Sequence, residues 1–144
     1  TLGEWTGLNV WTQEITNGQF DAFSLQFILG AILSPIAWIL GVPSSDLMLV
    51  GQLLGEKTIL NEFYAYVSLT EMRDQGLFSS ERSVVLVTYM LCGFANISSI
   101  GIQIGGIGVL APSRRKELSE LGVKALIAGT MASLYTAAII GLLI

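Results

Sequence analysis

Long apolar stretches alternate with short polar ones along this chain of 144 residues. After a mixed, polar lead-in over residues 1–21, residues 22–43 are predominantly apolar, and Pro35 stands inside this stretch. Proline removes a backbone donor and clashes with the preceding turn, so the stretch predicts an interfacial or bent helix. The lead-in carries Trp5 and Trp11, and tryptophan is typical of the boundary between water and lipid.

Two apolar half-helices follow within residues 46–70, on either side of a polar cluster. Each half has about ten residues and spans roughly 15 Å, whereas the hydrocarbon core of a bilayer is about 30 Å thick. One continuous helix has the right length, but it places Glu56 and Lys57 near its middle. Inserting each charge into the membrane there costs about 3 kcal/mol of free energy. The pattern therefore predicts a re-entrant hairpin that turns at residues 55–58 and faces a site with its polar residues.

The rest of the chain contains two more apolar stretches. Residues 80–112 are polar in their middle third, at residues 92–99, which predicts a broken transmembrane helix. A basic loop at residues 114–116 then leads to a final transmembrane helix within residues 113–144. Small residues predict close helix contact on both stretches: Gly101, Gly105, Gly106 and Gly108 on the first, and Ala128, Gly129, Ala132, Ser133, Ala137 and Ala138 on the second.

Composition places the chain in the membrane class. The chain is 52% hydrophobic and 12% charged, which is about half of the charged share of an average soluble domain. A net charge of −4 with 7 basic residues argues against a nucleic-acid partner. Histidine is absent and Cys92 is the single cysteine, so no metal site, disulfide or nucleophile–base pair is expected, and the chain is not predicted to be an enzyme. Cys92 itself is expected to be a small buried hydrophobe.

Charge asymmetry predicts the orientation in the membrane. Arg114, Arg115, Lys116 and Lys124 cluster between the last two apolar stretches, while the other polar segments carry mainly acids. Because cytoplasmic loops are enriched in basic residues, this loop is expected in the cytoplasm and the C-terminus outside. The hairpin then opens from the outside.

Polar side chains at the expected membrane depth are candidate ligands. Glu62 needs a partner, a proton or a ligand there, because an unpaired acid is costly in the membrane, and Lys57 is one candidate partner. Asn96 and Ser99 are three residues apart, so they share one face of a helix, near Phe94. They either bond to other helices or bind a hydroxyl-rich ligand. Two classes therefore stay open: a secondary transporter, and a helix-packing subunit or channel piece.

Two motifs resemble the C-terminal half of concentrative nucleoside transporters, of the bacterial nucleoside permease type. Residues 55–66 read Gly-Glu-Lys-Thr-Ile-Leu-Asn-Glu-Phe-Tyr-Ala-Tyr, and residues 92–100 read Cys-Gly-Phe-Ala-Asn-Ile-Ser-Ser-Ile. The later run Gly-Gly-Ile-Gly…Ala-Pro-Ser-Arg-Arg is similar as well, so the similarity covers about residues 33–144. The N-terminal half of the family is absent, and the chain begins without methionine or a basic segment, so a piece of a longer protein is expected.

The resemblance implies one inverted repeat of an all-α membrane transporter: an interfacial helix, a re-entrant hairpin, a broken helix and a final transmembrane helix. It implies nucleoside import by cation symport, without a cofactor, through an elevator mechanism in a homotrimer of the bacterial inner membrane. By motif position, Glu62 is expected to bind the ribose hydroxyls, and Phe94, Asn96 and Ser99 are expected to contact the nucleoside. Carboxylate, amide and hydroxyl groups suit a sugar, because together they accept and donate hydrogen bonds.

Some features stay open at this point. In the family, the ion site and the base-reading residues lie mainly in the N-terminal half, so both Na+ and H+ remain candidate coupling ions. The preference for purine or pyrimidine nucleosides is open for the same reason. Glu56 and Lys57 match the tip of the hairpin, and the resemblance assigns them no ligand contact.

Overall fold

The computed structural model describes residues 7–16 and 18–144. Within them all regular structure is helical, in agreement with the predicted all-α class. The α-helices are α2 (Leu8–Ile15), α3 (Leu25–Ile39), α4 (Leu47–Ile59), α5 (Glu62–Asp74), α6 (Glu81–Leu91), α7 (Ile97–Leu110) and α8 (Arg115–Gly141), and the short 3₁₀ helices η1 (Ser44–Asp46) and η2 (Pro112–Arg114) precede α4 and α8. The lead-in thus contains a helix, α2, that the sequence pattern does not predict, and Trp5 lies outside the described residues.

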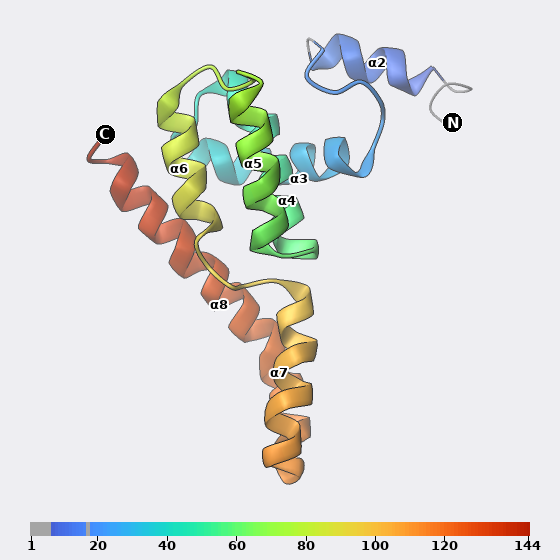
Figure 1. Ribbon diagram of the computed structural model, residues 1–144, viewed down its shortest axis with the longest axis vertical. Coiled ribbons are helices and arrows are strands. Elements are labelled where there is room, and N and C mark those ends of the chain that lie inside the picture. The colour runs from blue at the N-terminus through green and yellow to red at the C-terminus, as the bar shows by residue number, and fades with distance from the viewer. Residues whose placement is uncertain (1–6, 17) are drawn as a thin grey trace.

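Helix α8 is the longest element, and two helices pack directly along it, while α2 lies apart from it (Figure 1). Helix α7 lies against its N-terminal half, and α6 packs against its C-terminal half. The hairpin of α4 and α5 lies beside α6, and α3 packs on α4. One core of buried apolar side chains joins α3, α4, α5, α6 and α8; it includes Ala37, Val50, Leu53, Leu54, Ala65, Leu69, Leu86, Val87, Met90, Leu91 and Ala137.

Helix α3 continues through Pro35 instead of ending there. Proline cannot donate to the carbonyl of Ala31, one turn earlier, and the hydroxyl of Ser34 donates to that carbonyl instead, at 3.1 Å. The helix packs closely on α4 across Gly30, where an added Cβ would lie 2.8 Å from a backbone oxygen of α4. Residues 22–43 thus hold a single helix of 15 residues.

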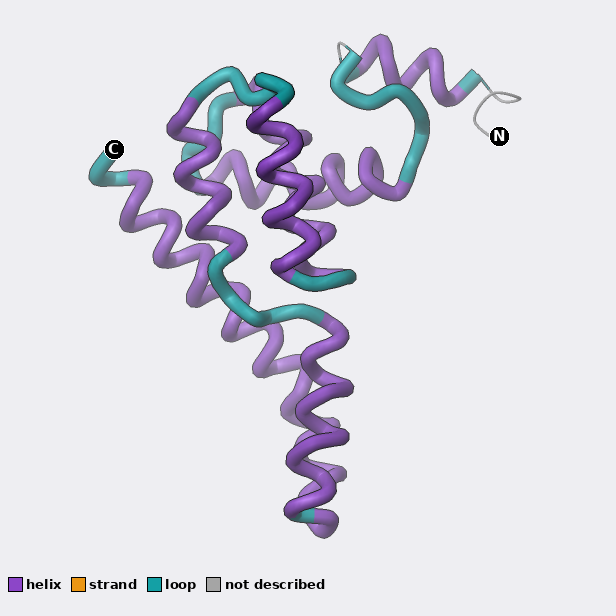
Figure 2. Tube along the Cα trace, viewed as in Figure 1, coloured by secondary structure: helices purple, strands orange, loops and turns teal. Residues whose placement is uncertain are grey.

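Helices α4 and α5 form a hairpin, but the predicted turn at residues 55–58 is wrong. Helix α4 continues to Ile59, and the chain reverses at Leu60 and Asn61, in the short loop between the two helices (Figure 2). The side chain of Asn61 accepts a hydrogen bond from the backbone N–H of Tyr64 at 2.9 Å and so caps α5. Asparagine is among the preferred N-cap residues, so the turn follows from this cap and not from the charges before it.

Glu56 and Lys57 lie inside α4 and not at the hairpin tip that the sequence predicts. They are 5% and 1% exposed. The Nε2 atom of Gln52 donates to Oε1 of Glu56 at 2.7 Å, and the ammonium of Lys57 finds its partners on α6 and α8. Buried charge is tolerated where the protein supplies such partners, so α4 has no reason to break at these two residues.

Helices α6 and α7 are the two halves of a broken helix, and residues 92–96 connect them in a non-helical conformation (Figure 2). Helix η2 and α8 follow α7 almost directly, so residues 114–116 form a tight turn and a helix start, not the predicted loop. Arg115 stabilises this short connection, because its Nε donates to the carbonyl of Gly108 at 3.1 Å, near the end of α7. In the described part of the chain, one helical stretch is long and apolar enough to cross a bilayer: Pro112–Gly141, with 30 residues.

Some of the predicted small residues make close contacts and others do not. On α7, an added Cβ at Gly108 would lie 2.9 Å from Cγ of Arg115 in α8. An added Cβ on Gly129 would lie 3.2 Å from the Cβ of Ala95. At Gly101, Gly105 and Gly106 an added Cβ would meet no atom within 4 Å. The packing surface predicted on α7 therefore has no partner helix among residues 7–16 and 18–144 at these three positions.

Candidate functional site

The turn of the hairpin meets the break between α6 and α7. Asn96, the last residue of the break, donates from Nδ2 to Oε2 of Glu62 at 2.9 Å. The hydroxyl of Ser98 lies 3.1 Å from the carbonyl oxygen of Leu60, in the turn. Two segments that are far apart in the sequence thus form one hydrogen-bonded unit, the turn–break junction (residues 60–62 and 92–99).

Two helices begin at the turn–break junction, and each has an asparagine as its N-cap. Asn61 caps α5, and Asn96 caps α7 by accepting from the backbone N–H of Ser99 at 2.8 Å. The hydroxyls of Ser98 and Ser99 each lie 2.7 Å from the same oxygen, Oδ1 of Asn96. Glu62 occupies the first turn of α5, where the positive end of the helix dipole favours a carboxylate. The junction therefore holds an anionic acceptor at two helix N-termini.

The four predicted ligand residues lie near one another at this junction. Asn96 is 3% exposed, Glu62 is half-buried, and Phe94 is 79% exposed. The hydroxyl of Ser99 lies 3.0 Å from the carbonyl oxygen of Phe94. One part of the prediction is wrong: Asn96 and Ser99 do not share the face of a continuous helix, because Asn96 is extended and caps the helix that contains Ser99.

Ser98 is a junction residue that the sequence pattern does not single out. It links α7 to the hairpin turn through its distance of 3.1 Å to the carbonyl oxygen of Leu60. A signal is present, because an asparagine followed by serines two and three positions later is typical of a helix N-terminus with side chains bonded to the backbone. That signal becomes visible only once the helix is known to restart at Ile97.

Lys57 is not the partner of Glu62. Its ammonium donates to the carbonyl of Met90 at 2.7 Å and to Oγ of Ser133 at 3.0 Å, whereas Glu62 accepts from Asn96. The candidate pairing of Lys57 with Glu62 is therefore wrong. Glu62 keeps a polar partner that a ligand can replace.

Cys92 opens the break and is exposed, so the prediction of a small buried hydrophobe is wrong. Leu91, the last residue of α6, is fully buried. The chain leaves the core between these two residues, because the helix ends there. The thiol of Cys92 therefore lies at the surface, two residues before Phe94.

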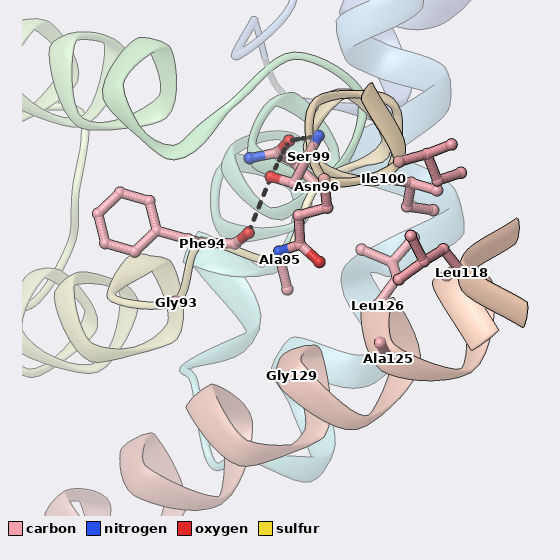
Figure 3. A pocket seen from close by; sticks show the side chains of 13 residues that line it. Gly93, Phe94, Ala95, Asn96, Ser99, Ile100, Leu118, Ala125, Leu126 and Gly129 are labelled. Atoms are coloured by element: carbon pink, nitrogen blue, oxygen red, sulfur yellow. Dashed lines mark hydrogen bonds between the residues drawn. The ribbon is translucent and has the colours of Figure 1, made fainter. Parts of the chain in front are cut away.

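A cavity of about 220 Å³ lies between α7 and α8, beside the break (Figure 3). Asn96 and Ser99 contribute to its wall, together with residues of α8: Leu118, Gly122, Ala125, Leu126 and Gly129. Phe94 also lies at the wall, but its ring points away from the residues of α8 (Figure 3), and Glu62 is not part of the lining. The cavity is therefore not the place where all four predicted residues reach one ligand.

Comparison with known proteins gives matches along nearly the whole chain. The profile of the family described as "Na+ dependent nucleoside transporter C-terminus" matches residues 3–141. The uncharacterized transporter YutK of Bacillus subtilis is 44% identical over 135 residues, which are 90% of this chain and 33% of that protein. The sodium/nucleoside cotransporter 1 of Rattus norvegicus is 41% identical over 135 residues, 85% of this chain and 21% of that protein. The chain thus spans about a third or less of the length of these relatives.

The fold is similar to a solved structure, that of CNTnw in an inward-facing substrate-bound state. The TM-score is 0.80 and the sequence identity is 37%, over 96% of this chain and 34% of that chain. These relatives are transporters and not enzymes, which agrees with the prediction from the sequence.

Proposed function

The chain belongs to the family of Na+ dependent nucleoside transporters, and from this premise we propose that it supplies the ribose-binding side of the nucleoside site in a secondary active transporter. Family membership confirms the resemblance that residues 55–66 and 92–100 carry. The chain spans 33% of the length of the Bacillus subtilis relative, so the proposal concerns a longer transporter whose C-terminal part this chain represents.

The observation that carries the proposal is the hydrogen bond between Asn96 and Glu62, at 2.9 Å. A carboxylate accepts several hydrogen bonds and an amide both donates and accepts, so the pair matches the two hydroxyls of a ribose. Hydrogen bonds to a charged group contribute about 1.5–3 kcal/mol each. Without a nucleoside the two side chains bond to each other, which avoids an unpaired acid at membrane depth.

Phe94 and Ser99 extend the proposed site beyond the sugar. The ring of Phe94 is 79% exposed, so its apolar face is free to stack on a flat base. The hydroxyl of Ser99 both donates and accepts, so it can exchange its contact with Asn96 for one with the nucleoside. The proposed nucleoside contacts are therefore Glu62, Phe94, Asn96 and Ser99.

The hairpin is proposed to be re-entrant. Helices α4 and α5 have 13 residues each, or about 20 Å at roughly 1.5 Å per residue, which is too short for a hydrocarbon core of about 30 Å. Helices α6 and α7, with 11 and 14 residues, are equally short and are proposed to cross together as one broken helix. The resemblance adds a homotrimer and an elevator-type movement, which belong to the proposal for the whole transporter.

Uptake by the full-length transporter tests the proposed function. Reconstituted vesicles are expected to accumulate labelled uridine or adenosine above the external concentration when an inward Na+ gradient is imposed. Replacing Na+ by choline is expected to abolish this accumulation, because the rat relative is named a sodium/nucleoside cotransporter and the same coupling is proposed here. A matched proton gradient without Na+ serves as the control.

Two results would change this proposal in different ways. Accumulation driven by the proton gradient alone would keep the nucleoside transporter and replace Na+ by H+ as the coupling ion. Absence of accumulation under both gradients, with the protein folded in the vesicles, would contradict the transporter and favour a non-transporting helix-packing subunit or channel piece.

Residues 114–116 are proposed to face the cytoplasm, with the C-terminus outside. A cysteine introduced at Ser113 is expected to react with an impermeant maleimide only from the cytoplasmic side, because three basic residues follow it directly and basic segments stay inside. Gln75→Cys is the matched control: it is exposed in the connection between α5 and α6, at the other end of the molecule (Figure 1), and should react only from outside. Reaction of Ser113→Cys from outside would reverse the orientation.

A further inference from the structure

Helix α6 ends at the break, and its last carbonyl groups lack partners within the helix. The final four carbonyls of any α-helix are left without an intrahelical donor. In α6, which ends at Leu91, two of them accept from side chains of the hairpin instead. The hydroxyl of Tyr66 donates to the carbonyl of Thr88 at 2.8 Å, and the ammonium of Lys57 donates to the carbonyl of Met90 at 2.7 Å.

We infer that Lys57 and Tyr66 are positioning residues: they cap the carbonyl end of α6 and so hold the break, which carries Phe94, in the place where Asn96 meets Glu62. This inference rests on the proposed function for its effect on nucleoside binding. The capping contacts themselves are observed in the structure and do not depend on the proposed function.

Lys57 is the stronger of the two caps. It is 1% exposed, and burial of a charged group is costly unless it is hydrogen-bonded. Its ammonium bridges the carbonyl of Met90 on α6 and the hydroxyl of Ser133 on α8, and that hydroxyl lies 2.9 Å from the carbonyl oxygen of Thr130. A positive charge at the carbonyl end of a helix is also favoured by the helix dipole. The side chain therefore joins α4, α6 and α8 at one point.

The connection to the ligand residues is direct. An added Cβ on Gly93 would lie 3.6 Å from Nζ of Lys57 and 3.2 Å from Cβ of Ser133, so the chain passes beside the ammonium one residue before Phe94. Displacement of the ammonium leaves room for the chain to move at Gly93. The side chain of Lys57 thus restricts where the break can run.

Side chains of the hairpin bond to the chain on both sides of the break. Lys57 and Tyr66 hold the end of α6, while Glu62 holds Asn96 at the start of α7. Glu62 and Tyr66 are four residues apart, so they lie on the same face of α5. One short sequence segment therefore positions both halves of the broken helix, and only Glu62 in it is proposed to touch the nucleoside.

The test uses the full-length transporter with Lys57→Met, which keeps the apolar stem and removes the ammonium, and with Tyr66→Phe, which removes one hydroxyl. Tyr64→Phe is the matched control, because it removes the hydroxyl of a half-exposed tyrosine two residues away on α5. Two quantities are measured: the dissociation constant for uridine, and the rate at which the exposed Cys92 is alkylated, followed on its peptide by mass spectrometry.

Lys57→Met removes a charged hydrogen bond and is expected to raise the dissociation constant for uridine about tenfold or more. Tyr66→Phe removes a neutral hydrogen bond and is expected to raise it roughly twofold to tenfold. Both are expected to speed the alkylation of Cys92 without uridine, because the break moves more freely. At saturating uridine the rates of variants and wild type are expected to converge, since the ligand then holds the break. Tyr64→Phe is expected to change neither quantity by more than about twofold.

Folded Lys57→Met and Tyr66→Phe proteins that keep the wild-type rate of Cys92 alkylation would overturn the inference. If Lys57→Met does not fold, Tyr66→Phe against Tyr64→Phe decides in the same way, because the phenyl ring is kept in both. If the wild-type protein itself binds no uridine, the proposed function fails. The alkylation rates without uridine then still support or overturn the capping of α6 by the hairpin.

Discussion

Replacing Glu62 by glutamine in the full-length transporter is expected to raise the dissociation constant for uridine by about tenfold or more. The substitution keeps the size of the side chain and removes its charge, so hydrogen bonds from the ribose hydroxyls lose the charged acceptor that makes each of them worth about 1.5–3 kcal/mol. Stability should fall little, because an acid in the first turn of a helix contributes only about 0.3–1 kcal/mol through the helix dipole. Equilibrium binding of uridine to the purified protein measures the effect.

The specificity of this effect for the sugar is tested with an analogue. 2′,3′-Dideoxyuridine lacks both hydroxyls, so the wild-type protein and Glu62→Gln are expected to bind it with similar, weak affinity. Glu71→Gln is the matched control, since it makes the same change at an exposed position near the other end of α5, and it should bind uridine like the wild type. Unchanged uridine binding by a folded Glu62→Gln protein would remove Glu62 from the proposed site.

Replacing Asn96 by aspartate is expected to weaken uridine binding even more, by about a hundredfold. Asn96 donates from Nδ2 to Glu62 at 2.9 Å, and aspartate puts a second carboxylate at this position. Two like charges at such a distance repel each other strongly in a low-dielectric site. Aspartate is also a good N-cap, so α7 should keep its start, but the second buried carboxylate is expected to lower the melting temperature as well.

The matched control for this substitution is Asn9→Asp. The side chain of Asn9 also accepts a backbone hydrogen bond, from Phe23 at 3.1 Å, but it lies outside the turn–break junction. Its replacement is expected to leave uridine binding unchanged. Binding by Asn96→Asp within about twofold of the wild type would show that the proximity of Asn96 and Glu62 has no part in nucleoside recognition.

The helical class and the division into segments follow from the sequence because they depend on local properties. The lengths of apolar stretches set how many helices fit across a bilayer, and they indicated both a hairpin and a broken helix. The motif resemblance then selected Glu62, Phe94, Asn96 and Ser99, and the structure places these four near one junction. Their binding to a nucleoside stays a prediction.

The position of the hairpin turn shows where reasoning from local charge fails. The charged pair Glu56 and Lys57 suggested a break because an unpaired charge is costly in the membrane. In the structure both side chains have hydrogen-bond partners within the protein, although Oε2 of Glu56 has none in the described part of the chain, and α4 runs past them. The actual turn has a local signal, the N-cap Asn61, which was not identified as a cap from the sequence.

Where α5 and α7 begin depends on the local sequence, because a helix and its N-cap depend on side chains within about four positions of each other, although neither cap was predicted. Asn61 and Asn96 are such caps. Which charged group meets which partner depends instead on how helices distant in the sequence pack together. Lys57 reaches Met90 and Ser133, 33 and 76 residues away, and Glu62 reaches Asn96, 34 residues away. Whether a buried charge is stable depends on these partners, and they arrive only when separate helices pack together.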